Sequence, residues 1–161
     1  PYSVASPLII NVLESPLQFQ GAWVMVQREV ADRLTAEPGS KAWGPLGVVA
    51  QIWADVRRLQ SVSPGSFWPA PNVESMTVEL RRTEERRRQV RDYEVFTGLV
   101  QRIFQGRRKL LKNPLSAFAP EADAAELMAR ADLPSRMRSD QVSLPALIRL
   151  ANAVAACQGN G

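Results

Sequence analysis

An aromatic, proline-rich segment is the first part of this chain whose residue types could do chemistry. It runs from Phe67 to Ser75 and reads Phe-Trp-Pro-Ala-Pro-Asn-Val-Glu-Ser. An aromatic ring can stack on a nucleobase, which is worth roughly 1–3 kcal/mol per base. Prolines fix backbone φ angles and so reduce the entropy lost when a loop clamps a ligand. Phe67 is therefore a candidate ligand-binding residue; core packing and a proline-rich docking loop are the alternative interpretations.

A cluster of cations is the second such feature. Residues 81–112 carry eleven Lys or Arg and four Asp or Glu, while the whole chain has a formal net charge of +4. Arg107, Arg108 and Lys109 are consecutive, and Lys112 follows them. Arginine offers a planar fork of donors that suits phosphate oxygens. The cluster is typical of a nucleic-acid contact, and a solvated basic face is the alternative.

Composition argues against several other classes of site. The 161 residues include no histidine and one cysteine, Cys157. A zinc site of the usual kind then has almost no ligands, and serine–histidine catalysis lacks its base. Apolar runs are too short to span a bilayer, and no signal peptide pattern is visible. We therefore expect no metal, no membrane contact and a cytoplasmic location.

The elements that must position these residues follow from hydrophobic periodicity. Ser6-Pro7 is typical of an N-cap followed by proline at the first helical position. The apolar run over 20–27 predicts a strand buried on both faces of its sheet. Expected strands cover 20–27, 56–62 and 76–80, and expected helices cover 7–15, 28–34, 46–53, 122–130 and 144–156. Apolar residues recur at helical spacing from Tyr93 to Phe104, and Leu110 to Phe118 continue an apolar face after the basic cluster.

The pattern changes near residue 85, where the strand signals stop. An α/β part over residues 1–85 and a small all-α domain over residues 86–161 are predicted. Two strands joined by a long loop, after alternating helices and strands, fit the final strands of an open α/β sheet.

Five ordered segments of the chain match the motifs of one family. Pro1-Tyr2 with Ser6-Pro7-Leu8 resembles the second half of an Asn-Leu-Pro-Tyr turn and the helix after it. Residues 67–75 resemble a Phe-x-Pro-x-Pro-x-Val-x-Ser segment, and 104–115 a Phe-x-x-Arg-Arg-Lys-x-Leu/Ile segment. Residues 25–34 and 38–46 extend the match. The family that these segments resemble is the ribosomal RNA adenine dimethyltransferases.

The resemblance implies the carboxyl-terminal part of a Rossmann-like class I methyltransferase domain, followed by a helical RNA-binding domain. It implies methyl transfer from S-adenosylmethionine to N6 of adenines in small-subunit ribosomal RNA. Pro1 and Tyr2 would hold and stack the extruded base, and Phe67 would form the other wall of its pocket. Expected RNA contacts are Arg33, Arg107, Arg108, Lys109 and Lys112, the three consecutive cations lying on a short helix. For Arg33, an ion pair on the helix surface with Glu29 or Glu37 is the alternative interpretation.

Three positions bear on how far the resemblance extends. Trp43 stands where the family usually has tyrosine, and Trp68 stands where it has a small polar residue; we expect Trp68 to pack on its own loop. Pro1 lies inside the expected catalytic turn, so we expect this chain to be a carboxyl-terminal piece that is inactive alone. Its nine glycines are scattered, and the one Gly-x-Gly, Gly159-Asn160-Gly161, is at the end of the sequence rather than between a strand and a helix. We therefore expect an amino-terminal half to bind the methyl donor, without a metal.

The expected partner is a 30S-type ribosomal particle, bound by a monomer. Other functions fit parts of the same pattern. They are a non-catalytic RNA-binding or ribosome-assembly module, a large-subunit methyltransferase of the macrolide-resistance type, and a module that docks on another protein through the proline-rich loop.

Overall fold

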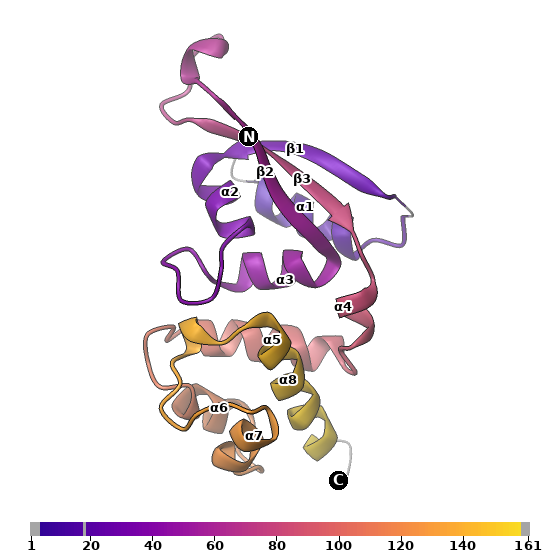
Figure 1. The fold of residues 1–161 in the computed structure, drawn as a ribbon, viewed down its shortest axis with the longest axis vertical. Coiled ribbons are helices and arrows are strands. Elements are labelled where there is room, and N and C mark those ends of the chain that lie inside the picture. The colour runs from indigo at the N-terminus through magenta and orange to yellow at the C-terminus, as the bar shows by residue number, and fades with distance from the viewer. Residues whose placement is uncertain (1–3, 18, 159–161) are drawn as a thin grey trace. The chain divides into compact units, whose positions relative to one another are not determined.

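The chain folds into two compact units. The computed structural model describes residues 4–17 and 19–158. The first unit comprises Pro1–Ala36 and Leu46–Glu84, and the second comprises Glu37–Pro45 and Glu85–Gly161 (Figure 1). The sequence predicts a single boundary at residue 85. In the structure, the short segment 37–45 also belongs to the second unit, although the residues on both sides of it in the chain belong to the first.

The first unit has an α/β fold built on a three-stranded antiparallel sheet. The central strand β3 (Ser75–Arg82) pairs with β1 (Gly21–Gln27) on one side and β2 (Ala54–Val62) on the other. Three helices accompany the sheet: α1 (Ala5–Glu14), α2 (Arg28–Leu34) and α3 (Pro45–Trp53). Their apolar residues form one core with Val26, Val78 and Leu80 of the strands.

The other face of this sheet is exposed along β1. Val26 is 1% exposed, whereas Trp23 is 67% and Met25 is 48% exposed. Successive side chains of a strand point to opposite faces, so an unbroken apolar run places large side chains on both. Within the described residues, only one of these faces is covered. The prediction of a strand buried on both faces is therefore wrong for this chain.

Helix α1 begins earlier than its sequence signal suggests. Val4 is the residue that precedes the helix, and it makes no side-chain capping bond. Ser6 and Pro7 lie in the first turn, so the predicted cap at Ser6 is wrong. Proline is tolerated here because the first N–H groups of a helix have no intrahelical partner.

The second unit is helical. Its helices are α4 (Glu85–Arg88), α5 (Tyr93–Phe104), α6 (Lys112–Phe118), α7 (Ala124–Arg130) and α8 (Leu144–Gln158). Asp92 caps α5 by accepting a hydrogen bond from the Val95 N–H at 3.0 Å. The predicted cap of the last helix is confirmed, because Ser143 Oγ accepts from the Ala146 N–H at 3.4 Å.

The described residues include neither a helix that could span a membrane nor a group of side chains that could hold a metal ion. Across residues 4–17 and 19–158, no helix combines the length and the apolar character needed to cross a membrane. In the same part of the chain, no three His, Cys, Asp or Glu side chains gather where they could hold a metal ion. Cys157 is a free, exposed thiol.

Candidate nucleic-acid interface

The aromatic loop, residues 63–74, joins β2 to β3. Figure 1 shows it projecting beyond the end of the sheet, with the short 3-10 helix η2 (Pro64–Ser66) inside it. Phe67 is half-buried, and its N–H donates to the Pro64 carbonyl at 3.2 Å. Trp68 is 98% exposed, so the prediction that it packs on the loop is wrong. The backbone is extended at Phe67, which sends neighbouring side chains in opposite directions.

A carboxylate ties the two ends of the aromatic loop together. Glu74 accepts a short hydrogen bond from Ser61 Oγ at the end of β2. Its other oxygen accepts from Arg28 Nη1 at 2.6 Å, and its carbonyl accepts from the Arg28 N–H at 3.0 Å. The Ser61 hydrogen bond, and then Arg28, hold the pKa of Glu74 below its ordinary value. The loop is thus anchored to the first turn of α2 as well as to β2.

Two predicted base-binding residues, Pro1 and Tyr2, lie outside the described residues. The pocket between Tyr2 and Phe67 therefore stays a prediction. Arg33, a predicted RNA contact, is exposed near the end of α2. It forms no ion pair or hydrogen bond with any residue that the structure describes, so pairing with Glu29 or Glu37 is not observed.

The basic triplet lies on a turn rather than on a helix. Helix α5 ends at Phe104, and residues 105–109, which we call the basic turn, connect it towards α6. The Lys109 N–H donates to the Gly106 carbonyl at 2.7 Å, which closes the turn. The prediction of a short helix is wrong because Gly106 disfavours helix continuation and the chain must reverse before α6.

Arg107 holds the segment 37–45 within the second unit. Its guanidinium donates to the Lys41 carbonyl at 2.5 Å and to the Ser40 carbonyl at 3.0 Å. The Gly39 N–H donates to the Asp140 carbonyl at 2.6 Å, and the φ of +85° at Gly39 favours glycine. Both terminal nitrogens of Arg107 are therefore occupied by backbone oxygens.

Trp43, like Arg107, holds segment 37–45 in place within the second unit. No sequence motif indicated this role for it. Its side chain is 1% exposed, and Nε1 donates to the Val142 carbonyl at 3.1 Å. Its ring lies edge-on to Phe104, with centroids 6.5 Å apart and planes at 77°. The only sequence signal was the replacement of a tyrosine usual in the family by a larger ring with an N–H donor.

The remaining cations of this region are available to a ligand. Arg108, Lys109 and Lys112 are exposed and form no hydrogen bond or ion pair through their side chains with the described part of the chain. Residues 95–120 contain five Lys or Arg and no Asp or Glu. The basic turn and its flanking helices therefore present positive charge that no neighbouring carboxylate in this stretch offsets.

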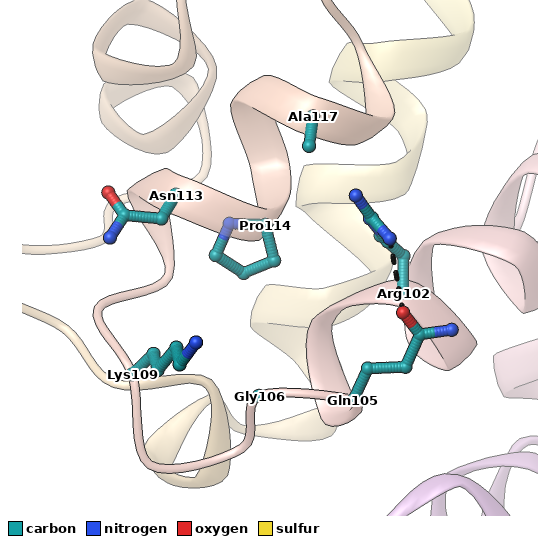
Figure 2. Close-up of a pocket in the computed structure, with 7 residues that line it drawn as sticks. All are labelled: Arg102, Gln105, Gly106, Lys109, Asn113, Pro114 and Ala117. Atoms are coloured by element: carbon teal, nitrogen blue, oxygen red, sulfur yellow. Dashed lines mark hydrogen bonds between the residues drawn. The ribbon is translucent and has the colours of Figure 1, made fainter.

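A small pocket opens beside the basic turn (Figure 2). Its volume is about 280 Å³. Arg102, one of its lining residues, donates through Nη1 to Gln105 Oε1 at 3.1 Å. The full lining is Arg102, Gln105, Gly106, Lys109, Asn113, Pro114 and Ala117. Of these, the sequence motifs had indicated only Lys109 as a binding residue.

The described residues do not by themselves fit S-adenosylmethionine. A Cβ at Gly21 would meet the Leu80 carbonyl oxygen at 3.3 Å, so this glycine serves close packing within the sheet. Gly65 faces open space. Neither belongs to a glycine-rich loop of the kind that holds a cofactor.

Comparisons with known proteins agree with this fold. The family described as "Ribosomal RNA adenine dimethylase" matches residues 1–155. A dimethyladenosine transferase from Plasmodium falciparum shares the fold with a TM-score of 0.82 at 21% identity, covering 93% of this chain and 62% of that one. The 23S rRNA methyltransferase ErmE gives 0.64 at 21% identity, covering 96% of this chain and 62% of that one.

Curated relatives match over most of this chain. The "Ribosomal RNA small subunit methyltransferase A" of Lactobacillus delbrueckii is 40% identical, covering 96% of this chain and 52% of the relative. The proteins of the same name from Streptomyces avermitilis and Pseudomonas aeruginosa are 39% and 35% identical, covering 94% and 99% of this chain and 52% and 58% of theirs. The chain thus spans about half the length of these relatives. Because the family matches nearly all of it, this chain belongs to the ribosomal RNA adenine dimethylase family.

Proposed function

We propose that the protein carrying this chain transfers methyl groups from S-adenosylmethionine to N6 of adenines in small-subunit ribosomal RNA. The observation that carries this proposal is the family match over residues 1–155. The names of the curated relatives support the small subunit as the substrate particle. The protein would act as a monomer on a 30S-type particle in the cytoplasm.

Phe67 would form one wall of the site for the target base. The exocyclic amine of adenine is a poor nucleophile because its lone pair is delocalised, and the base must leave its stack to react. A half-buried ring on a loop tied at its base by Glu74 suits such a base, since the loop loses little freedom on binding. Pro1 and Tyr2 would hold the amine and supply the opposite ring.

The methyl donor would be held by parts of the protein beyond the residues described. Gly21 and Gly65 belong to no glycine-rich loop, and the chain spans about half the length of its relatives. We therefore expect negligible binding of S-adenosylmethionine to the isolated chain of 161 residues. Isothermal calorimetry that detects micromolar binding to it would contradict this expectation.

Exposed cations would hold the RNA backbone. Arg108, Lys109 and Lys112 have free side chains within the described residues, as does Arg33 in the first unit. Such contacts position an RNA without reading its sequence. Arg107 would act indirectly, by holding segment 37–45 in place beside the basic turn.

A methyl-transfer assay with the intact protein tests the proposal. Purified small subunits that lack adenine dimethylation would receive labelled methyl groups from S-adenosylmethionine, and large subunits would serve as the competing substrate. We expect label in small-subunit RNA only. Label in large-subunit RNA would favour the macrolide-resistance type of activity. Tight binding to small subunits without any transfer would favour the assembly module instead.

A further inference from the structure

The pocket beside the basic turn has the size of a site for one small group. Figure 2 shows Arg102 and Gln105 at the end of α5 on one side, and Asn113, Pro114 and Ala117 of α6 on the other. Its volume of about 280 Å³ lies just below the range of roughly 300–1,000 Å³ typical of sites for drug-sized ligands. A single nucleotide unit is a better match to this volume than an extended ligand.

The charges around the pocket favour an anion. Arg102 and Lys109 line it, and no Asp or Glu does. The whole stretch 95–120, which supplies every lining residue, contains no acidic side chain. A negative group entering the pocket therefore meets two cations and no lining carboxylate that would repel it.

The polar groups of the pocket can recognise more than charge. Arg102 holds Gln105 Oε1, which leaves the amide N–H groups of Gln105 as donors. The Asn113 side chain forms no hydrogen bond with any described residue. Two carboxamides can donate to and accept from ribose hydroxyls or base edges. Pro114 and Ala117 add an apolar surface against which a sugar or base can pack.

Glycine at position 106 lets Lys109 lie across the turn. A Cβ added there would be 3.2 Å from Cδ and 3.5 Å from Cγ of Lys109. The aliphatic part of the lysine therefore packs directly on the turn backbone, and a larger residue at 106 would move it. This packing limits the conformations open to the Lys109 ammonium group.

We propose that this pocket binds one nucleotide unit of the RNA, with the phosphate between Arg102 and Lys109 and the sugar or base edge against Gln105 and Asn113. The assignment rests on the proposed function, because it names a second place where the same RNA is held. It adds three residues that the sequence motifs did not indicate: Arg102, Gln105 and Asn113.

A matched pair of charge changes on α5 and its end tests the pocket. Gln105→Glu places a carboxylate in the lining, and Gln101→Glu places one on the exposed surface of the same helix, outside the lining. Both variants change the net charge of the intact protein equally. We expect Gln105→Glu to weaken binding to purified small ribosomal subunits about tenfold, and Gln101→Glu less than about twofold, at fixed salt. Equal effects of the two variants would overturn the proposal.

The salt dependence of binding gives a second test that does not depend on the first. Arg102→Gln removes a phosphate contact if the proposal holds, so the slope of log K against log salt should become shallower by about 1. Arg136→Gln, at an exposed arginine outside the pocket, should leave that slope unchanged. An unaltered slope for Arg102→Gln, in a protein that still binds and methylates small subunits, overturns the pocket alone. A wild-type protein that does not bind these subunits overturns the proposed function as well.

Discussion

The aromatic loop and the basic turn are held in place by different kinds of interaction. The loop depends on Glu74 and Arg28, whose side chains are 34% and 61% exposed. The basic turn is secured by Arg107, which donates to backbone carbonyls, while the buried indole of Trp43 anchors the segment that Arg107 grips. One segment thus relies on an ion pair and a hydrogen bond between partly exposed side chains, and the other relies on packing and backbone hydrogen bonds.

This difference predicts different sensitivities. Exposed ion pairs contribute little to stability, and their contribution depends on protonation and salt. Loss of a large buried side chain leaves a cavity, which costs several times more. The basic turn should therefore respond most to changes in packing, and the aromatic loop to changes in pH.

Replacing Trp43 should have the largest effect on stability. Trp43→Ala removes a side chain that is 1% exposed, its hydrogen bond to Val142 and its edge-on contact with Phe104. We expect a loss of about 3–5 kcal/mol in the free energy of unfolding, measured by urea denaturation followed by circular dichroism. Trp68→Ala is the matched control in the aromatic loop. Since Trp68 is 98% exposed, its loss should change stability by less than about 0.5 kcal/mol.

The two neighbouring arginines of the basic turn should behave differently. Arg107→Ala removes two hydrogen bonds from a charged donor and should cost about 1.5–3 kcal/mol of stability. Arg108→Ala should leave stability nearly unchanged and weaken binding to small subunits, because its side chain is exposed and has no partner among the described residues. Parallel unfolding and subunit-binding curves check both. The reverse pattern would mean that Arg108, rather than Arg107, supports the turn.

Sequence periodicity predicted the helices and strands well where their pattern is long and regular. The apolar residues that recur at helical spacing from Tyr93 to Phe104 lie in α5, and the three expected strands lie within a few residues of β1, β2 and β3. The spacing of apolar residues in a helix or a strand is a property of neighbouring residues, so it can be recognised without knowledge of the tertiary structure. The exposure of Trp23 was not predictable from the strand itself, because it depends on what covers the sheet.

The anchoring of segment 37–45 could not be predicted for a related reason. Trp43 and Val142 are 99 residues apart, and Arg107 and Lys41 are 66 apart. No local pattern encodes such pairings, so a motif of three cations suggested one shared role for Arg107, Arg108 and Lys109. The turn at Gly106 could have been predicted from the sequence, because a glycine at the end of a helical pattern is typical of a helix end.

Phe67 should matter for catalysis more than for stability. Phe67→Leu keeps an apolar side chain but removes the ring, and Phe67→Tyr keeps the ring. If the ring stacks on the target adenine, the leucine variant of the intact protein should lose roughly ten- to hundredfold in methyl transfer, and the tyrosine variant should retain most of it. Single-turnover transfer to small subunits is the measurement. A leucine variant with wild-type transfer would instead assign Phe67 to packing of the loop.

The smallest effect, and the most specific to the aromatic loop, is expected at Glu74. Its folded-state pKa is lowered from 4.5 by Ser61 and then Arg28, so ionised Glu74 stabilises the folded first unit. For a lowered pKa, this contribution is complete above the unfolded-state value and is lost as pH falls through the folded-state value. Glu74→Gln should therefore be less stable than wild type at pH 7, and the difference should shrink as pH falls below 4.5.

A double-mutant cycle identifies the source of the Glu74 effect. Ser61→Ala removes the hydrogen bond that contributes most to the lowered pKa. In that background, Glu74→Gln should cost less stability at pH 7 than it does in the wild type, and the pH dependence of the cost should flatten. If the two substitutions are additive at every pH, Ser61 and Glu74 do not act together. Arg28 and the prolines of the loop would then hold the aromatic loop in place. In that case, sensitivity to pH would not distinguish the aromatic loop from the basic turn.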